Sequence, residues 1–391
     1  MKQKKPFFQR LFVAFMMMQL IAYFLNSDMY FQLSGMFIFL FGAILAGLLW
    51  MFFYIWRKPV NFFQSISILL LACMLVSVVA NPGVVESGYL LSYILLICMT
   101  FLFASVDLDE KDLKRIGGAY VALAVIISLL IIIVHRRFYA EESNRITIQI
   151  GSNPLIDPNY LGACLVAPSF LSLKWAMEEK KKLRYWLLTA IILVGIFMTG
   201  SRGALLAWAG GVFIVFCKLF FKHISVKKIG LLCLGGVTAL VAALRFIPKA
   251  YVERMLDPGN WMDASNMRRF ALWKNAIEKI LERPLLGHGL GNTATVIGSA
   301  AHNTYLELCV HLGLSGGLLF LLLMALVFFR KNNIYAKAIL FSTAIWAVFI
   351  SAEVTMYLWL NLSLGIAYCL LEQKKSCPPK GQKRQPSQSR E

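Results

Sequence analysis

Residues 265–317 read SNMRRFALWKNAIEKILERPLLGHGLGNTATVIGSAAHNTYLELCVHLGLSGG. The stretch places two adjacent arginines, Arg268 and Arg269, at the head of an amphipathic segment, a glycine-rich turn after Pro284, and His302 directly before a long apolar run. Most of the remaining chain is apolar. This contrast predicts that the polar chemistry of the protein is concentrated at the rim of a group of membrane-spanning helices.

The composition is typical of a polytopic membrane protein and excludes a soluble core. Of 391 residues, 59% are hydrophobic and only 15% are charged. A formal net charge of +19 also occurs in nucleic-acid-binding proteins, but here the basic residues lie between apolar runs long enough to cross a bilayer. We therefore interpret them as topology signals and expect no nucleic acid partner.

The apolar runs predict an all-α fold of about 12 transmembrane helices. The expected spans are 9–26, 35–56, 61–80, 88–105, 116–135, 159–176, 186–200, 204–221, 229–247, 304–329, 338–351 and 353–371. Together they form one membrane domain, residues 1–376. The tail at 377–391 is expected to be disordered, basic and cytoplasmic.

The distribution of lysine and arginine between these spans predicts the topology. Every second connection is basic, whereas the connections 26–34 and 81–88 contain no lysine or arginine. Short cytoplasmic loops carry such an excess of basic residues. Both termini are therefore expected in the cytoplasm, and the large loop at 248–303, between spans 9 and 10, is expected on the outer face.

The large outer loop is basic despite its expected location. Eight lysines and arginines lie between Arg245 and His302, on the side where short loops avoid them. Long loops are translocated despite their charge, so a solvated domain explains this composition as well as an anion-binding site does. None of the eight cysteines lies in this loop or pairs at metal-ligand spacing, so we expect neither a disulfide framework nor a metal site.

Within the loop, apolar residues recur at helical spacing from Met267 to Leu281, and Pro284 follows. This pattern predicts a short amphipathic helix that lies on the membrane surface. Its arginines fit an interfacial anchor whose charged ends extend into water, and they also fit an anion site.

Arg202 is the sole charge in the turn between the apolar runs 191–200 and 204–221. A guanidinium in this place needs an anion or carbonyl groups, and its planar fork of donors suits phosphate. The alternative is a side chain that extends to water or lipid headgroups.

His302 stands at the mouth of the span at 304–329. Thr304 and Glu307 fit a helix capping box, with Asn303 as the alternative cap. His302 has no part in that cap, and its ordinary pKa of about 6.5 suits a general base. An interfacial histidine that only forms hydrogen bonds is the alternative.

The glycine-rich turn at 287–291 superficially resembles a nucleotide-binding loop. No strand precedes it, so dinucleotide binding is excluded. Its glycines allow backbone amides to approach either a phosphate or another helix closely. At the start of the span at 159–176, Asp157-Pro158-Asn159 is explained by a proline-containing helix cap.

Together these motifs resemble those of the O-antigen ligase and O-antigen polymerase superfamily of bacterial membrane glycosyltransferases. The matching features are Thr199-Gly200-Ser201-Arg202-Gly203 between two spans, Arg269-x-x-x-Trp273 leading to Pro284-Leu285-Leu286-Gly287-His288-Gly289, and His302-Asn303-x-Tyr305-Leu306 with Gly313 and Gly316 beyond. Asp157-Pro158-Asn159 also fits the start of a span in this family.

The resemblance implies transfer of a glycan from an undecaprenyl-pyrophosphate donor to an acceptor hydroxyl on the outer face of the bacterial inner membrane. It implies no cofactor, no nucleotide and no obligatory metal. By motif position, Arg202 and Arg269 hold the pyrophosphate, with Arg268 as the neighbouring candidate, and His302 lies at the acceptor. Supporting positions would be Ser201, Gly287, His288, Gly289, Asn303, Tyr305 and Asn159, with His288 as the reserve base.

A ligase and a polymerase of this family differ in the acceptor, which is lipid A core or another surface anchor in one case and a second growing chain in the other. A ligase-like function is our first interpretation, and an O-antigen or exopolysaccharide polymerase is the alternative. A flippase for the same lipid-linked glycan is the competing class, because about 12 spans also fit a carrier. Carriers keep ionisable residues near the membrane midplane, whereas here Lys174, Glu307, His311 and Glu353 lie toward predicted span ends.

We predict that Asn292 faces the outside, because no other assignment fits the alternation of basic loops as well. After replacement of the native cysteines, a cysteine at Asn292 should react with a membrane-impermeant maleimide added from outside. A cysteine at Lys181 should react only after the membrane is opened. Labelling of position 292 from the cytoplasmic side alone would show that the topology is wrong.

Overall fold

The computed structural model describes residues 5–25, 37–54, 60–133, 136–140, 143–148, 156–179, 182–220 and 264–376. The predicted span at 229–247, the beginning of the large loop up to residue 263 and the tail 377–391 lie outside these ranges.

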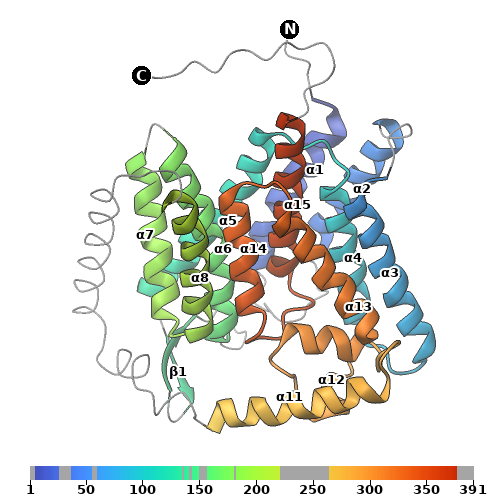
Figure 1. Cartoon of the computed structure of the whole chain (residues 1–391). Helices are drawn as coiled ribbons and strands as arrows, with labels where there is room; N and C mark the ends of the chain where they lie inside the picture. The colour runs from blue at the N-terminus through green and yellow to red at the C-terminus, as the bar shows by residue number, and fades with distance from the viewer. Residues whose placement is uncertain are drawn as a thin grey trace.

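The described chain is helical apart from one two-stranded antiparallel hairpin (Figure 1). The helices are α1 (Phe7–Leu25), α2 (Phe37–Tyr54), α3 (Phe62–Ala80), α4 (Ser87–Phe103), α5 (Glu110–Ile133), α6 (Pro158–Glu178), α7 (Lys182–Met198), α8 (Arg202–Phe220), α11 (Ala264–Glu282), α12 (Thr293–Ile297), α13 (Thr304–Phe329), α14 (Ile334–Trp346) and α15 (Met356–Ser376). Strands β1 (Arg136–Ala140) and β2 (Ser143–Thr147) form the hairpin, which the sequence pattern did not predict.

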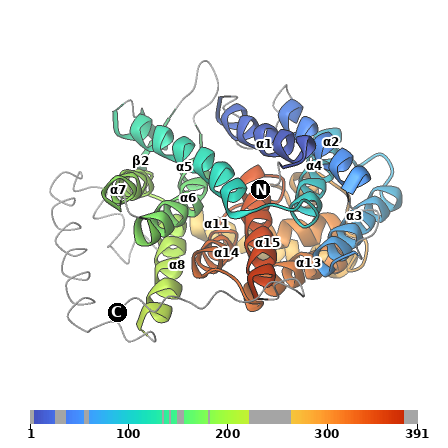
Figure 2. The same cartoon turned by 90° about the horizontal axis from the view of Figure 1, so that it is seen from above.

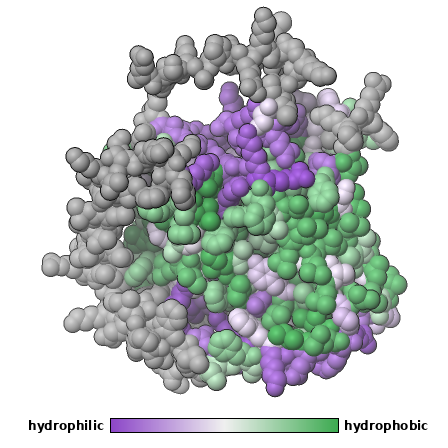
Figure 3. All heavy atoms as spheres, in the orientation of Figure 1, coloured by the Kyte–Doolittle hydropathy of each residue, from purple (hydrophilic) through white to green (hydrophobic). Residues whose placement is uncertain are grey.

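The helices confirm an integral membrane fold. Four of them, α3, α5, α6 and α13, are long and apolar enough to cross a membrane, and five further apolar helices are shorter. In Figure 3, hydrophobic side chains cover the middle of the molecule and hydrophilic side chains gather at its two ends. Eleven of the twelve predicted spans coincide with described helices, but the exact number of spans stays a prediction.

Two helices form the centre of the bundle. Every residue of α15 from Met356 to Cys369 is buried, and α6 is buried along most of its length. In Figure 2, α15 lies near the middle of the bundle, where it contacts α4, α5, α13 and α14. Helix α6 packs between α5, α7, α8 and α14. These enclosed helices carry buried polar side chains, among them Ser172, Lys174 and Asn361, which lie inside the protein.

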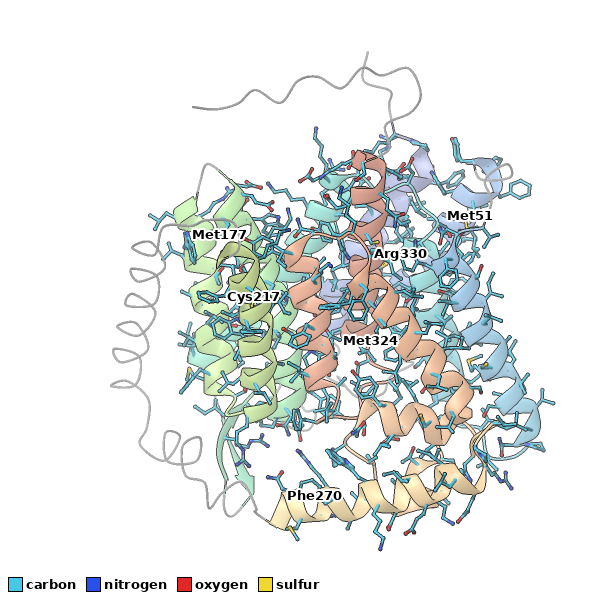
Figure 4. All side chains as sticks on the ribbon, viewed as in Figure 1. Met51, Met177, Cys217, Phe270, Met324 and Arg330 are labelled. Atoms are coloured by element: carbon cyan, nitrogen blue, oxygen red, sulfur yellow. The ribbon has the colours of Figure 1, made fainter. Side chains whose placement is uncertain are left out.

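Helix α11 runs across one end of the bundle, opposite the end where α1 begins and α15 finishes (Figure 1). Leu272, Ala276 and Ile280 are buried on one side of α11. Ala276 and Ile280 pack against Ile297 of α12 and Val310 of α13. Other apolar residues are about half exposed, among them Phe270, which is labelled in Figure 4. The predicted amphipathic helix is therefore present, and its inner face joins it to the bundle.

Helix α13 has the predicted boundaries but is broken at Gly313, whose φ of 72° and ψ of 179° are not helical. A Cβ atom at Gly313 would lie 2.4 Å from the Leu285 carbonyl oxygen, and one at Gly287 would lie 2.5 Å from the His311 carbonyl oxygen. Leu314 N donates to Pro284 O at 2.7 Å. The break in α13 leaves backbone groups without partners inside the helix, and the turn after α11 binds them.

We predict that Gly313→Ala destabilises the protein by about 1–3 kcal/mol, because alanine is strained at positive φ and its Cβ would meet the turn. Thermal unfolding of the detergent-purified protein measures the effect as a lower Tm. The matched control is Gly118→Ala in α5, where a Cβ atom would meet nothing within 4 Å. An unchanged Tm for Gly313→Ala would contradict the proposed constraint.

Candidate functional site

The start of α6 is fixed by the predicted proline-containing cap. Asp157 Oδ1 accepts from Asn159 N at 2.7 Å, and Pro158 occupies the first turn, where a missing N–H costs nothing. The Asn159 side chain is then available for contacts to other segments. Its Oδ1 accepts from Arg145 Nη2 at 2.5 Å and from Ser201 Oγ at 3.1 Å.

These contacts join the hairpin, α6 and the turn before α8. Gly200 takes a φ of 64°, and Ser201 Oγ accepts from Ala204 N at 3.3 Å at the start of α8. Arg202, the first residue of α8, is partly exposed. Arg145, from the hairpin, is a second arginine beside this turn that the sequence motifs did not identify.

Helix α11 distinguishes between the two adjacent arginines. Arg269 is partly buried, on the same side of the helix as the buried Ala276 and Ile280, whereas Arg268 is exposed. One turn after Arg269, Trp273 Nε1 donates to Ala301 O at 2.9 Å. Arg269 is therefore the arginine directed toward the bundle.

The pKa of His302 depends on the charges at the starts of α6 and α11. Burial lowers the pKa of His302, Arg269 lowers it further, Asp157 opposes this by raising it, and Arg268 lowers it again. The imidazole is therefore neutral at pH 7, in the form that accepts a proton. The hydrogen bond from Trp273 to Ala301 O, at 2.9 Å, joins α11 to the residue before His302.

The backbone of His302 is strained. Its φ of 50° is in the left-handed region, and no other non-glycine residue among the described segments takes a positive φ. Histidine tolerates this conformation better than branched residues, but it still costs about 1–3 kcal/mol and requires support from the surroundings.

The capping box predicted for α13 is wrong. Asn303 is the N-cap, because its Oδ1 accepts from Tyr305 N at 3.0 Å and from Leu306 N at 3.2 Å. Glu307 is then one residue too far along to close the box. Its carboxylate instead accepts from Ala301 N at 2.6 Å and from Ser351 Oγ at 2.7 Å.

The irregular segment 347–355 is a part of the site that sequence motifs missed. The sequence predicts spans at 338–351 and 353–371, but α14 ends at Trp346 and α15 begins at Met356. Thr304 binds this segment with three hydrogen bonds. Its N–H donates to Ala347 O at 2.8 Å. Its hydroxyl donates to Ile350 O at 2.7 Å and accepts from Ala352 N at 3.0 Å. Residues 347–355 contain no proline or glycine, so no helix-breaking residue marks this segment in the sequence.

The same segment contacts α6 and the first turn of α8, which carries Arg202. Tyr160 of α6 donates to Ser351 O at 2.6 Å, and a Cβ atom at Gly203 would lie 3.1 Å from the ring of Phe349. The turn that carries Arg202 is thereby connected to the entrance of α13, where His302 lies.

Four of the predicted supporting residues make packing contacts. Gly287 faces His311 of α13, and a Cβ atom at Gly289 would lie 3.1 Å from Asn81 Cβ in the α3–α4 connection. His288 N donates to Val310 O at 2.7 Å, and its Nε2 donates to Lys279 O at 2.8 Å. Tyr305 donates to Ala344 O at 2.9 Å. The side chain of His288 is thus engaged in holding the turn, and any further role for it is untested.

Comparison with known proteins agrees with the motifs. Residues 187–321 match the family model described as O-antigen ligase. This stretch is similar to the O-antigen ligase family. The matched region contains Arg202, Arg269 and His302, whereas Asn159 and the segment 347–355 lie outside it.

A relative in Haemophilus influenzae, described as an uncharacterized protein, is 29% identical to this chain over 191 residues. The aligned part covers 41% of this chain and about half, 47%, of the relative. The similarity to O-antigen ligases therefore extends over residues 187–321, and the chain spans about half the length of this relative.

We predict that Arg269→Gln raises the pKa of His302, because removal of a nearby cation favours the protonated imidazole. The pH dependence of His302 carbethoxylation by diethyl pyrocarbonate, followed by peptide mass spectrometry, measures this pKa because only the neutral ring reacts. Arg283→Gln is the control, since Arg283 donates to Asn81 Oδ1 at 2.7 Å, away from His302. An unchanged or lowered midpoint in Arg269→Gln would refute the assignment.

Proposed function

We propose that this protein transfers a glycan from an undecaprenyl-pyrophosphate donor to an acceptor hydroxyl on the outer face of the bacterial inner membrane. Both termini are then cytoplasmic. The proposal rests on one observation above all: His302 has a strained backbone, and the residue before it is bound by Trp273, one turn after Arg269 on α11, within the region that matches O-antigen ligase.

The arrangement suits a reaction that moves a proton and releases an anion. The acceptor oxygen would attack the anomeric carbon of the donor glycan and lose its proton to His302. The bond between that carbon and the pyrophosphate oxygen would break, and the lipid pyrophosphate would leave with the electron pair. Its negative charge grows as the bond breaks, so fixed guanidinium groups stabilise the transition state more than the ground state.

Arg202 and Arg269 are the proposed pyrophosphate ligands, with Arg268 at the exposed edge. Guanidinium forms two parallel hydrogen bonds to phosphate, which an ammonium group cannot reproduce. Bound pyrophosphate would also neutralise the cation that lowers the pKa of His302. The histidine would therefore become a stronger base when the donor is present, and no metal ion or cofactor is required.

The acceptor distinguishes the two forms of this function. Transfer to lipid A core or another surface anchor makes the protein a ligase, and transfer to a second lipid-linked chain makes it a polymerase. We take the ligase-like reaction as the first candidate because the family match carries the description O-antigen ligase.

Purified protein in lipid nanodiscs, mixed with a lipid-linked glycan and candidate acceptors, should yield products whose masses report the reaction. Single additions indicate a ligase, and ladders indicate a polymerase. His302→Ala should lose about 10²–10⁴-fold in turnover with donor binding retained. Arg202→Lys and Arg269→Lys should instead weaken donor binding.

Arg115→Lys, the same change in the first turns of α5, is the control and should behave as the unmodified protein. Near-normal turnover in His302→Ala would exclude the histidine as the base. Full activity in both lysine variants would exclude the arginine clamp. Movement of the lipid across the membrane without any transfer product would replace the proposal by a flippase.

A further inference from the structure

The residue before His302 is held from two sides. The Ala301 N–H donates to Glu307 Oε1 at 2.6 Å, and the Ala301 carbonyl accepts from Trp273 Nε1 at 2.9 Å. Glu307 belongs to α13 and Trp273 to α11, so side chains from two separate helices engage the polar groups of one residue.

Glu307 is fully occupied inside the protein. It is only 2% exposed, and its Oε1 accepts from Ser351 Oγ at 2.7 Å in addition to the Ala301 N–H. Its Oε2 lies 4.0 Å from Nε2 of the buried His311. A carboxylate enclosed in this way cannot reach a sugar or a phosphate. Any effect that it has on the reaction must pass through the groups that it binds.

The backbone of His302 needs such support. A non-glycine residue persists in the left-handed region only where the surroundings over-determine it. On the other side of His302, Asn303 is fixed as the cap of α13. With Ala301 and Asn303 both anchored, the chain between them has little freedom other than the observed φ of 50°.

We propose that Glu307 and Trp273 are positioning residues that hold His302 in its strained backbone conformation by binding the N–H and the C=O of Ala301. The inference rests on the proposed function of His302 as the base. It adds Glu307, whose spacing from Thr304 predicted a helix cap, and Trp273, to which the motif match assigns no role.

We call Glu307 and Trp273, with their hydrogen bonds to Ala301, the Ala301 clamp; the position of Trp273 also connects this clamp to the donor arginine. Trp273 follows Arg269 by one turn on α11, so one rigid helix carries the donor arginine and one side of the clamp. The distance between the pyrophosphate and the base would therefore be set by α11. A misplacement of about 1 Å in such a pair costs on the order of 10²-fold in rate.

Substitutions on either side of the clamp test this role. Trp273→Phe and Glu307→Leu should lower kcat by about 10- to 100-fold and change the donor KM by less than about twofold. Glu307→Gln retains an oxygen that accepts from Ala301 N–H and should recover most of the rate. In a His302→Ala background, neither substitution should cause a further loss, because a residue that acts through His302 has nothing left to position.

A second measurement does not depend on transfer. The rate of His302 carbethoxylation should change by about threefold or more in Trp273→Phe and Glu307→Leu, whereas His288 in the same samples should be unaffected. Trp186→Phe, at a position that is 37% exposed, and Glu372→Gln, near the end of α15, are the matched controls. If Glu307→Leu does not fold, Trp273→Phe carries the test from the other helix.

The outcomes separate the two proposals. Losses that add fully to that of His302→Ala, or an unchanged rate of His302 modification, would overturn the positioning role. Absence of any transfer by the unmodified protein would overturn the proposed function, while the modification rates would still decide whether the clamp holds His302.

Discussion

The hydrogen-bonding requirement of irregular backbone next to a membrane shapes the outer end of this protein. The segment 347–355 has no regular secondary structure, yet Ala347, Ala352 and Val354 within it are buried. Buried amides and carbonyls cannot remain unpaired at low dielectric. Thr304 meets this need with three hydrogen bonds and Tyr160 with a fourth, while Glu307 accepts from the side-chain hydroxyl of Ser351. The same bonds bring the entrances of α6 and α13 together.

A similar requirement explains the break in α13. A glycine at positive φ interrupts the helix, and the turn after α11 fills the gap with its own backbone. The backbone of the turn and that of α13 approach so closely that only glycine fits at positions 287 and 313. Gly287 in the turn that superficially resembles a phosphate loop thus packs backbone against backbone of α13, while Gly289 and Gly291 lie against the side chains of Asn81 and Glu86.

Much of the fold follows from the sequence, because the bilayer imposes simple rules. Apolar runs of sufficient length become helices, and the limits of α13 agree with the prediction at both ends. Helical spacing also predicts α11 and its ending before Pro284. The same rules fail where side chains decide the local structure. Hydropathy cannot reveal that the segment 347–355 is irregular, nor that the hairpin brings Arg145 beside Asn159.

The sequence predicts some residues of the candidate site but not the roles of others. Motif order identifies His302, Arg202 and Arg269 as candidates, but it cannot choose between Arg268 and Arg269 because neighbours in sequence differ only in helical face. The structure supplies that face, with Arg269 on the side of the buried Ala276. Glu307 was assigned to a cap because its spacing from Thr304 fits one, and only the three-dimensional contact to Ala301 shows otherwise.

Some residues of the candidate site lie inside the region that matches O-antigen ligase and others lie outside it. Arg202, Arg269 and His302 all lie within the family match, but two of their supports, Asn159 and Ser351, lie outside it. The charge of a leaving pyrophosphate is common to any donor of this class, so the cations that stabilise it have little room to vary. The two supports act through hydrogen bonds, Asn159 with Ser201 beside Arg202 and Ser351 with Glu307. Substitutions at these two supports would therefore shift the candidate residues without removing the charges that the proposed reaction needs.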